Sequence, residues 1–305
     1  MPRPIRGVLP IAHTPFTADD AIDDESLQRQ IDWAFAQGAD GFCLAMVSEL
    51  LRLTSSERVW MTKRLVELNA GRGVVVISVG AESTNQALFY ADQAAEAGAD
   101  AVMAIPPISS PLPDDELFAY FATIAEQVEM PLIVQDASGY VGQSIPIPMQ
   151  VRLVERFGAD KILFKPEAAP IGPNLTALRD ATSGRARIFE GSGGIYLVDS
   201  FRRGVIGTMP GMELLDGIVR LWRALEAGDE DAIYRLYLPI CGLVALQMQA
   251  GLDGFLAVEK YIMVNRGIFA NDYRRRPNAF QLDPETAAEI DRLLDRLQAA
   301  IDSAA

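Results

Sequence analysis

Histidine, cysteine and lysine are all scarce in this chain of 305 residues. Its one histidine, His13, argues against a histidine-based zinc site and against a Ser-His-Asp triad. Cys43 and Cys241 are too few for a disulfide framework and do not have metal-ligand spacing. We therefore expect a protein of the reducing cytoplasm with no metal and no cofactor.

Long apolar runs and basic blocks are also lacking. No run of 18 apolar residues appears, so no membrane span is predicted, and the N-terminal "MPRPIRG" does not lead into a signal peptide. The formal net charge is −14, and the only basic cluster is 274–276, which we interpret as a solvated or interface patch. Nucleic-acid binding is therefore not expected.

A repeated tripeptide is the clearest pattern that the chain does contain. Gly38-Ala39-Asp40, Gly98-Ala99-Asp100 and Gly158-Ala159-Asp160 recur at intervals of 60 residues. Each copy follows an amphipathic stretch and precedes an apolar run, as expected for a glycine that caps a helix before a buried parallel strand. Further strands are predicted midway, at 73–79 and 131–137, so each interval holds two βα units of about 30 residues.

Eight strands are predicted in all, near residues 6–12, 41–46, 73–79, 101–106, 131–136, 161–165, 187–191 and 205–209. Eight strands alternating with helices predict an α/β fold, the (β/α)8 TIM barrel. After about residue 212 the pattern is helical only. We expect a barrel core at 1–211, with the last barrel helix and a C-terminal helical extension at 212–305, as one structural unit.

A lysine ends the sixth predicted strand, in "KILFKPEA" at 161–168. Lys165 lies at the C-terminal end, where barrel active sites are found, whereas Lys161 begins the strand. A lysine among apolar residues has a lowered pKa, and its neutral amine can form a Schiff base with a carbonyl. The alternative is a structural lysine that is ion-paired with Glu190 or Glu167.

The chain resembles, over nearly its whole length, the dihydrodipicolinate synthase / N-acetylneuraminate lyase family of class I, Schiff-base aldolases and lyases. The resemblance is carried by "GVLPIAHTPF", "VISVGAESTNQALFYADQAAEAGADAVMAIPP", "ILFKPEA", "FEGSGG" and "GVIGTMPG". It implies that Lys165 is the Schiff-base lysine, that no metal is needed, and that the protein assembles as a homo-oligomer, a dimer or tetramer. A monomer that buries the extension on its own barrel stays open.

The segment that binds the substrate's carboxylate in the family departs from the family pattern. Ala45-Met46-Val47-Ser48-Glu49 stands where the family has Gly-Thr-Thr-Gly-Glu. Val47 and Ser48 remain the expected substrate-binding positions, through the Ser48 hydroxyl and the surrounding backbone amides. A helix N-cap is the structural alternative for Ser48, and tying down the loop is the role expected of Glu49.

The proton-transfer groups of the family are also replaced. Gln135 occupies the position of the general acid/base tyrosine but cannot exchange protons near neutrality, which leaves Asp136, Tyr140 or Ser48 for that role. Tyr140 also falls where the synthase branch keeps a carboxylate-binding arginine, and Ile108 replaces a second tyrosine. A turn residue is the alternative interpretation of Asp136.

These departures favour a branch that acts on 2-keto-3-deoxy sugar acids. Lys165 would form an imine with the C2 ketone of a small 2-keto acid, a base would remove a C3 proton, and the C4 hydroxyl would leave as water. Ser192 and Thr208 are expected to contact substrate hydroxyls, although small residues are common at strand ends. Two alternatives remain: a 4-hydroxy-tetrahydrodipicolinate synthase, and a barrel that binds a keto acid without turnover.

Overall fold

Strands and helices alternate along the chain in the computed structural model, which describes residues 3–303. The strands are β1 (Gly7–Val8), β2 (Gly41–Leu44), β3 (Val74–Ser78), β4 (Ala101–Ala104), β5 (Leu132–Asp136), β6 (Ile162–Pro166), β7 (Arg187–Glu190) and β8 (Gly207–Thr208). Every predicted strand is present, so the predicted (β/α)8 barrel class is confirmed.

The helices fill the intervals between the strands and continue beyond β8. They are α1 (Asp24–Gln37), α2 (Ser55–Asn69), α3 (Thr84–Ala97), α4 (Asp114–Gln127), α5 (Ile147–Phe157), α6 (Ile171–Ala181), α7 (Leu197–Arg202), α8 (Leu215–Ala227), α9 (Glu230–Met248), α10 (Gly251–Asn265) and α11 (Pro284–Asp302). Two short 3-10 turns, η1 (Met46–Ser48) and η2 (Leu50–Arg52), follow β2. The predicted C-terminal helical extension is therefore confirmed. Within residues 3–303 no helix is both long and apolar enough to cross a membrane.

The chain divides into two compact units, each built from segments distant in sequence. Unit 1 consists of Met1–Arg6, Thr54–Gly191 and Asp199–Thr208, and unit 2 consists of Gly7–Leu53, Ser192–Val198 and Met209–Ala305. The expected change from barrel core to helical extension near residue 211 stays a prediction.

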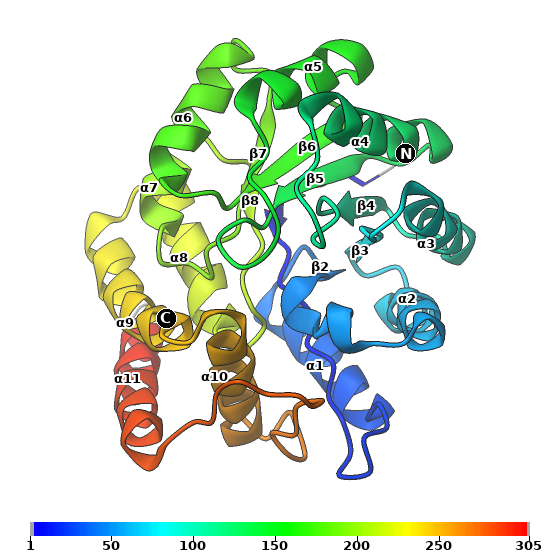
Figure 1. Cartoon of the computed structure of the whole chain (residues 1–305). Helices are drawn as coiled ribbons and strands as arrows, with labels where there is room; N and C mark the ends of the chain where they lie inside the picture. Colours follow the sequence, from blue (N-terminus) through cyan, green and yellow to red (C-terminus); the bar gives the residue numbers. More distant parts are fainter. Residues whose placement is uncertain (1–2, 304–305) are drawn as a thin grey trace. The chain divides into compact units, whose positions relative to one another are not determined.

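Unit 1 holds the parallel strands β3 to β8, each paired with the next. Each of the helices α2 to α6 packs against the next, and Figure 1 shows them in a row beside these strands. In unit 2, Ile11 bridges to Cys43 in the parallel sense, and α9 packs against α8, α10 and α11. The carboxyl ends of β5 and β6 therefore lie next to each other in unit 1.

Two of the three copies of the tripeptide repeat have a double structural role, whereas in the third copy Gly158 has ψ of 158°, outside the left-handed helical region, and Asp160 is exposed. Gly38 and Gly98 adopt left-handed conformations, with φ of 94° and 88°, and end α1 and α3. The aspartate that follows accepts a hydrogen bond from the backbone of the preceding strand. In the second copy, Asp100 Oδ2 accepts from the Val75 amide at 2.9 Å. Each of these repeats thus ends a helix and fixes the start of a strand pair.

Replacing Asp100 by alanine should therefore destabilise the fold. The change leaves the Val75 amide without its acceptor, and we expect a loss of about 1–3 kcal/mol in the free energy of unfolding, measured with urea. Asp160 is a matched control, because its side chain is fully exposed and makes only a 3.7 Å ion pair with Arg187. An Asp160→Ala variant as destabilised as Asp100→Ala would contradict this explanation.

Candidate functional site

Strand pairing places Lys165 beside Gln135. In the parallel register of β5 and β6, Gln135 is aligned with Lys165 and Asp136 with Pro166. Aligned residues of parallel strands project to the same side, and both side chains are buried, at 1% and 4% exposure. The apolar residues that precede Lys165 in β6, Ile162 to Phe164, are also buried, so the amine lies at the end of a dry strand.

A third side chain, Glu167, completes a buried cluster with these two. Its Oε1 lies 3.3 Å from Lys165 Nζ, and its Oε2 accepts a 2.8 Å hydrogen bond from Gln135 Nε2. The Glu167 amide donates to the Asp136 carbonyl at 2.9 Å, which fixes the residue beyond the end of β6. The ion pair considered as an alternative for Lys165 is therefore present.

The Glu167 carboxyl is suited to carrying a proton. Burial raises its pKa above the usual value, and the neighbouring Glu190 adds to this, while Lys165 and the Gln135 hydrogen bond offset part of the effect. A buried carboxyl beside an amine can take a proton from it and return the proton to a substrate. The sequence indicated Glu167 as a possible ion-pair partner of Lys165, and its spacing of two residues from Lys165 placed it on the same face of an extended segment.

The side-chain carbonyl oxygen of Gln135 is not used in this cluster. Gln135 Oε1 is buried and has no hydrogen-bond partner among residues 3–303. An unsatisfied buried acceptor is costly, and one in a site requires a donor from a ligand or from water. The arrangement thus offers an acceptor for a hydroxyl group next to the amine.

Gly191 gives Lys165 and Glu167 the space that they occupy. A β-carbon on Gly191 would lie 2.5 Å from Lys165 Cε and 2.6 Å from Glu167 Oε1, closer than real contacts allow. Only glycine therefore permits this arrangement of amine and carboxyl.

The Gly191→Ala variant should fold but lose activity. The added methyl group displaces both side chains, and displacement by about 1 Å costs on the order of 10²-fold in kcat/KM. Steady-state kinetics beside a thermal melt would test this. Activity within about threefold of wild type would show that the Lys165–Glu167 contact is not required.

Asp136, the last residue of β5, supports the loop that follows, which contains Tyr140. Both Asp136 carboxylate oxygens accept backbone hydrogen bonds, from Ser138 at 3.0 Å and Ile145 at 2.7 Å. The Tyr140 amide donates to the Ala137 carbonyl at 2.8 Å, in the turn that Asp136 holds. These contacts are those of the turn residue that we considered as the alternative for Asp136.

The two strand-end hydroxyls already have partners in the chain. Thr208 Oγ1 donates a 2.6 Å hydrogen bond to Glu190 Oε2, within unit 1. Ser192 Oγ, in unit 2, accepts from the Tyr196 amide at 3.0 Å. Thr208 therefore orients a buried carboxylate, and Ser192 stabilises the turn that follows it.

Unit 2 holds the segment of Val47 and Ser48. Ser48 Oγ donates to the Ala12 carbonyl at 2.5 Å and accepts from the Ala45 amide at 3.0 Å. Thr14 Oγ1 donates to the Ser48 carbonyl at 2.6 Å. Because its hydroxyl is engaged on both sides and its amide donates to the Ala45 carbonyl at 3.0 Å, Ser48 shapes the turn 45–49.

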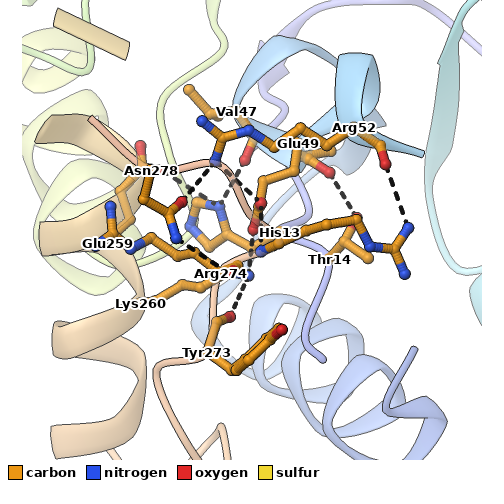
Figure 2. A network of polar contacts seen from close by, with 12 residues as sticks. His13, Thr14, Val47, Glu49, Arg52, Glu259, Lys260, Tyr273, Arg274 and Asn278 are labelled. Atoms are coloured by element: carbon orange, nitrogen blue, oxygen red, sulfur yellow. Dashed lines mark hydrogen bonds and ion pairs between the residues drawn. The ribbon is translucent and has the colours of Figure 1, made fainter. Parts of the chain in front are cut away.

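His13 lies between two buried carboxylates beneath this turn. Its Nε2 is 3.2 Å from Glu213 Oε2 and accepts from the Met212 amide, and its Nδ1 is 3.6 Å from Glu259 Oε2 and 3.5 Å from the Val47 carbonyl. The three side chains are close enough to be considered as metal ligands. The carboxylates lie beside opposite ring nitrogens, and Nε2 also faces the Met212 amide, so groups of the chain itself hold the ring from both sides. Figure 2 shows His13 beside Val47 and Thr14.

Comparisons with known proteins agree with the sequence resemblance. A model of the dihydrodipicolinate synthetase family matches residues 4–279. The L-2-keto-3-deoxyarabonate dehydratase of Azospirillum brasilense is 28% identical over 302 residues, 96% of this chain and 94% of the relative. The 4-hydroxy-tetrahydrodipicolinate synthase of Methanosarcina mazei is 28% identical over 244 residues, 78% of this chain and 81% of the relative.

A solved structure supports the same assignment. The crystal structure of dihydrodipicolinate synthase from Rhodopseudomonas palustris superposes with a TM-score of 0.86 at 28% identity, covering 96% of this chain and 97% of that one. The family match covers the strands that carry Lys165, Gln135 and Thr208. The chain therefore belongs to the dihydrodipicolinate synthetase family.

Proposed function

We propose that this protein is a Schiff-base lyase that removes water from a 2-keto-3-deoxy sugar acid, with Lys165 as nucleophile and Glu167 as the proton carrier. The observation that carries the proposal is the buried 3.3 Å contact between the Lys165 amine and the Glu167 carboxyl. A nucleophilic amine needs a group that removes its proton, and a carboxyl with a raised pKa is matched to that task.

The first half of the reaction forms the imine. Glu167 accepts a proton from the Lys165 ammonium, and the neutral amine attacks the C2 ketone of the substrate. The carbinolamine then loses its hydroxyl as water, using the proton held by Glu167, and a protonated imine remains. The positive charge of this imine acidifies the protons on C3.

The second half expels the C4 hydroxyl. Glu167, again a carboxylate, removes a C3 proton to give an enamine, and the electron pair then displaces the C4 hydroxyl, which leaves as water with that proton. Gln135 Oε1, a buried acceptor without a partner among the described residues, would accept a hydrogen bond from a hydroxyl of the substrate. Hydrolysis of the imine releases the product and regenerates Lys165.

The substrate's carboxylate is assigned to the turn 45–49. The Ser48 amide donates to the Ala45 carbonyl and the Ala45 amide donates to Ser48 Oγ, so the amides that we assign to the carboxylate are those of Met46 and Val47. This turn is the position of the family's carboxylate-binding segment. Ser48 thus contributes by shaping the turn.

Dehydration is favoured over the synthase reaction by the groups that replace the family's hydroxyls. Gln135 and Ile108 cannot relay protons, whereas the relative from Azospirillum brasilense, matched over 96% of this chain, is named a 2-keto-3-deoxyarabonate dehydratase. The synthase reaction remains the second candidate, because matched relatives such as that of Methanosarcina mazei are named as synthases.

We also propose homo-oligomeric assembly, since α9 exposes the apolar side chains of Tyr234, Leu238 and Met248.

Reductive trapping combined with product analysis tests the function. The protein is incubated with 2-keto-3-deoxy-L-arabonate, or with pyruvate alone or together with aspartate semialdehyde, and is then reduced with borohydride and analysed by peptide mass spectrometry. We expect an adduct on Lys165 and, from the sugar acid, a product lighter by one water. Pyruvate-dependent consumption of aspartate semialdehyde would instead support the synthase, and an adduct without turnover would support a keto-acid-binding barrel.

A further inference from the structure

A buried ion pair in unit 2 lies outside the proposed reaction. Glu49 and Lys260 are 2% and 1% exposed, and Lys260 Nζ donates a hydrogen bond to Glu49 Oε1. The same ammonium group donates to the Tyr273 carbonyl at 2.8 Å and lies 4.5 Å from the centre of the Phe16 ring. Figure 2 shows this pair within a larger polar network. A charge pair so deeply buried costs desolvation energy, so a role beyond stability is worth seeking.

Glu49 ends the turn 45–49 in a conformation that its side chain must hold. Its φ of 54° is left-handed, which is uncommon for a residue with a β-carbon. Its second oxygen, Oε2, accepts from the Arg275 amide at 3.1 Å and lies 3.4 Å from Arg52 NH1. One carboxylate therefore joins α10, η2 and the segment 273–275, and it holds the backbone directly after Ser48.

The charges around this carboxylate are balanced. Four cations, Lys260, Arg52, Arg274 and Arg275, interact with four carboxylates, Glu49, Asp253, Asp272 and Asp20. Arg274 also donates to the Asp253 and Phe280 carbonyls. The network is therefore neutral in formal charge, and its connection to the turn 45–49 runs through the Glu49 carboxylate.

We infer that Lys260 is a positioning residue, which acts through Glu49 to hold the turn 45–49 in the conformation that binds the carboxylate of the keto acid. The inference rests on the proposed function for the role of that turn. Without the lysine, Glu49 can leave its left-handed conformation and the amides of the turn diverge. Affinity for the substrate then falls, while the chemical step, which belongs to Lys165 and Glu167, keeps its rate.

The test compares Lys260→Met and the isosteric Glu49→Gln with wild type. We expect each change to raise KM, and the pyruvate concentration that gives half-maximal borohydride trapping, about tenfold, which is the effect of one charge-assisted hydrogen bond. The kcat should stay within about threefold of wild type. The double variant should be no weaker in binding than the worse single variant, because both changes break one interaction.

Lys161→Met is the matched control. Lys161 is a partly buried lysine that donates to the Val128 and Met130 carbonyls in unit 1. Its removal should lower the thermal midpoint without changing KM or the trapping curve. If a folded Lys260→Met or Glu49→Gln protein binds pyruvate with an affinity within about twofold of wild type, the inference is wrong. If pyruvate binding weakens equally in Lys260→Met, Glu49→Gln and Lys161→Met, the role of Lys260 is purely structural.

The pH dependence of binding gives a further readout. Burial lowers the pKa of Lys260 to about 8; Glu49 opposes this, and Arg274 and Arg52 add to it. The lysine is charged below that value and loses its charge above it, so KM of the wild type should rise through about pH 8 relative to Lys260→Met. If the KM–pH profiles of wild type and Lys260→Met superpose, the inference is wrong. If the wild type forms adducts without turnover, the proposed dehydratase is refuted, but the trapping comparison still tests the role of Lys260.

Discussion

Replacing Lys165 by methionine should abolish both the borohydride adduct and turnover. Methionine keeps most of the apolar volume of the side chain and removes only the amine, so the buried end of β6 can stay packed. Without a nucleophile no imine forms, and kcat/KM should fall by at least about 10⁴-fold, as it does when an enzyme loses a residue of its covalent machinery. Steady-state dehydration kinetics and intact-protein mass spectrometry measure the two effects.

Lys161→Met is the control for this change as well, because Lys161 directly precedes β6, whereas Lys165 lies near its carboxyl end. It should retain adduct formation and turnover, since its amine is engaged by the Val128 and Met130 carbonyls. A Lys165→Met protein that still forms a reducible adduct would place the nucleophile elsewhere. The adduct would then be mapped against Lys260, the other deeply buried lysine of the described chain.

The fold was predictable because its signals are local and repeated. Gly38 and Gly98 end helices, the aspartates after them hold strands, and each apolar run is short enough to be a strand. The strands that carry Gln135 and Lys165 were both predicted, and the structure adds their register, in which the two residues are aligned. Periodicity and caps carry this information without any tertiary contact.

The partners of polar groups were less predictable, because they depend on distances that sequence spacing does not contain. Ser48 carries a hydroxyl suited to a substrate, yet it is bonded to Ala12 and Ala45. Lys260 lies on a C-terminal helix without any local signal of a partner, yet it forms a buried salt bridge with Glu49, which is 211 residues away. Residue type predicted what these groups can do, and packing decided what they contact.

Changing Glu167 to glutamine is the second change with a large expected effect. The amide is isosteric, so Gln135 Nε2 can still donate to it and the neighbourhood of Lys165 keeps its shape. It cannot accept a proton, however, and we expect kcat to fall by about 10³-fold, within the range for loss of a general acid/base. The acid side of the wild-type pH–rate profile should lie above the usual range of a glutamate, because burial raises the pKa of Glu167 and the rate falls once its carboxylate is protonated.

Hydrogen–deuterium exchange of the pyruvate methyl group distinguishes proton transfer from mere support of Lys165. Pyruvate bound as an imine exchanges its C3 protons with D2O only if a base removes them, and NMR follows this without any dehydration. Glu167→Gln should still form a borohydride adduct, although more slowly, while its exchange rate per adduct falls more than about 10²-fold. If exchange per adduct matched wild type, another group would be the base, and Glu167 would serve only to hold the lysine. The exchange requires both an imine and a base. If Glu167→Gln keeps the adduct but loses the exchange, Lys165 forms the imine and Glu167 is the base.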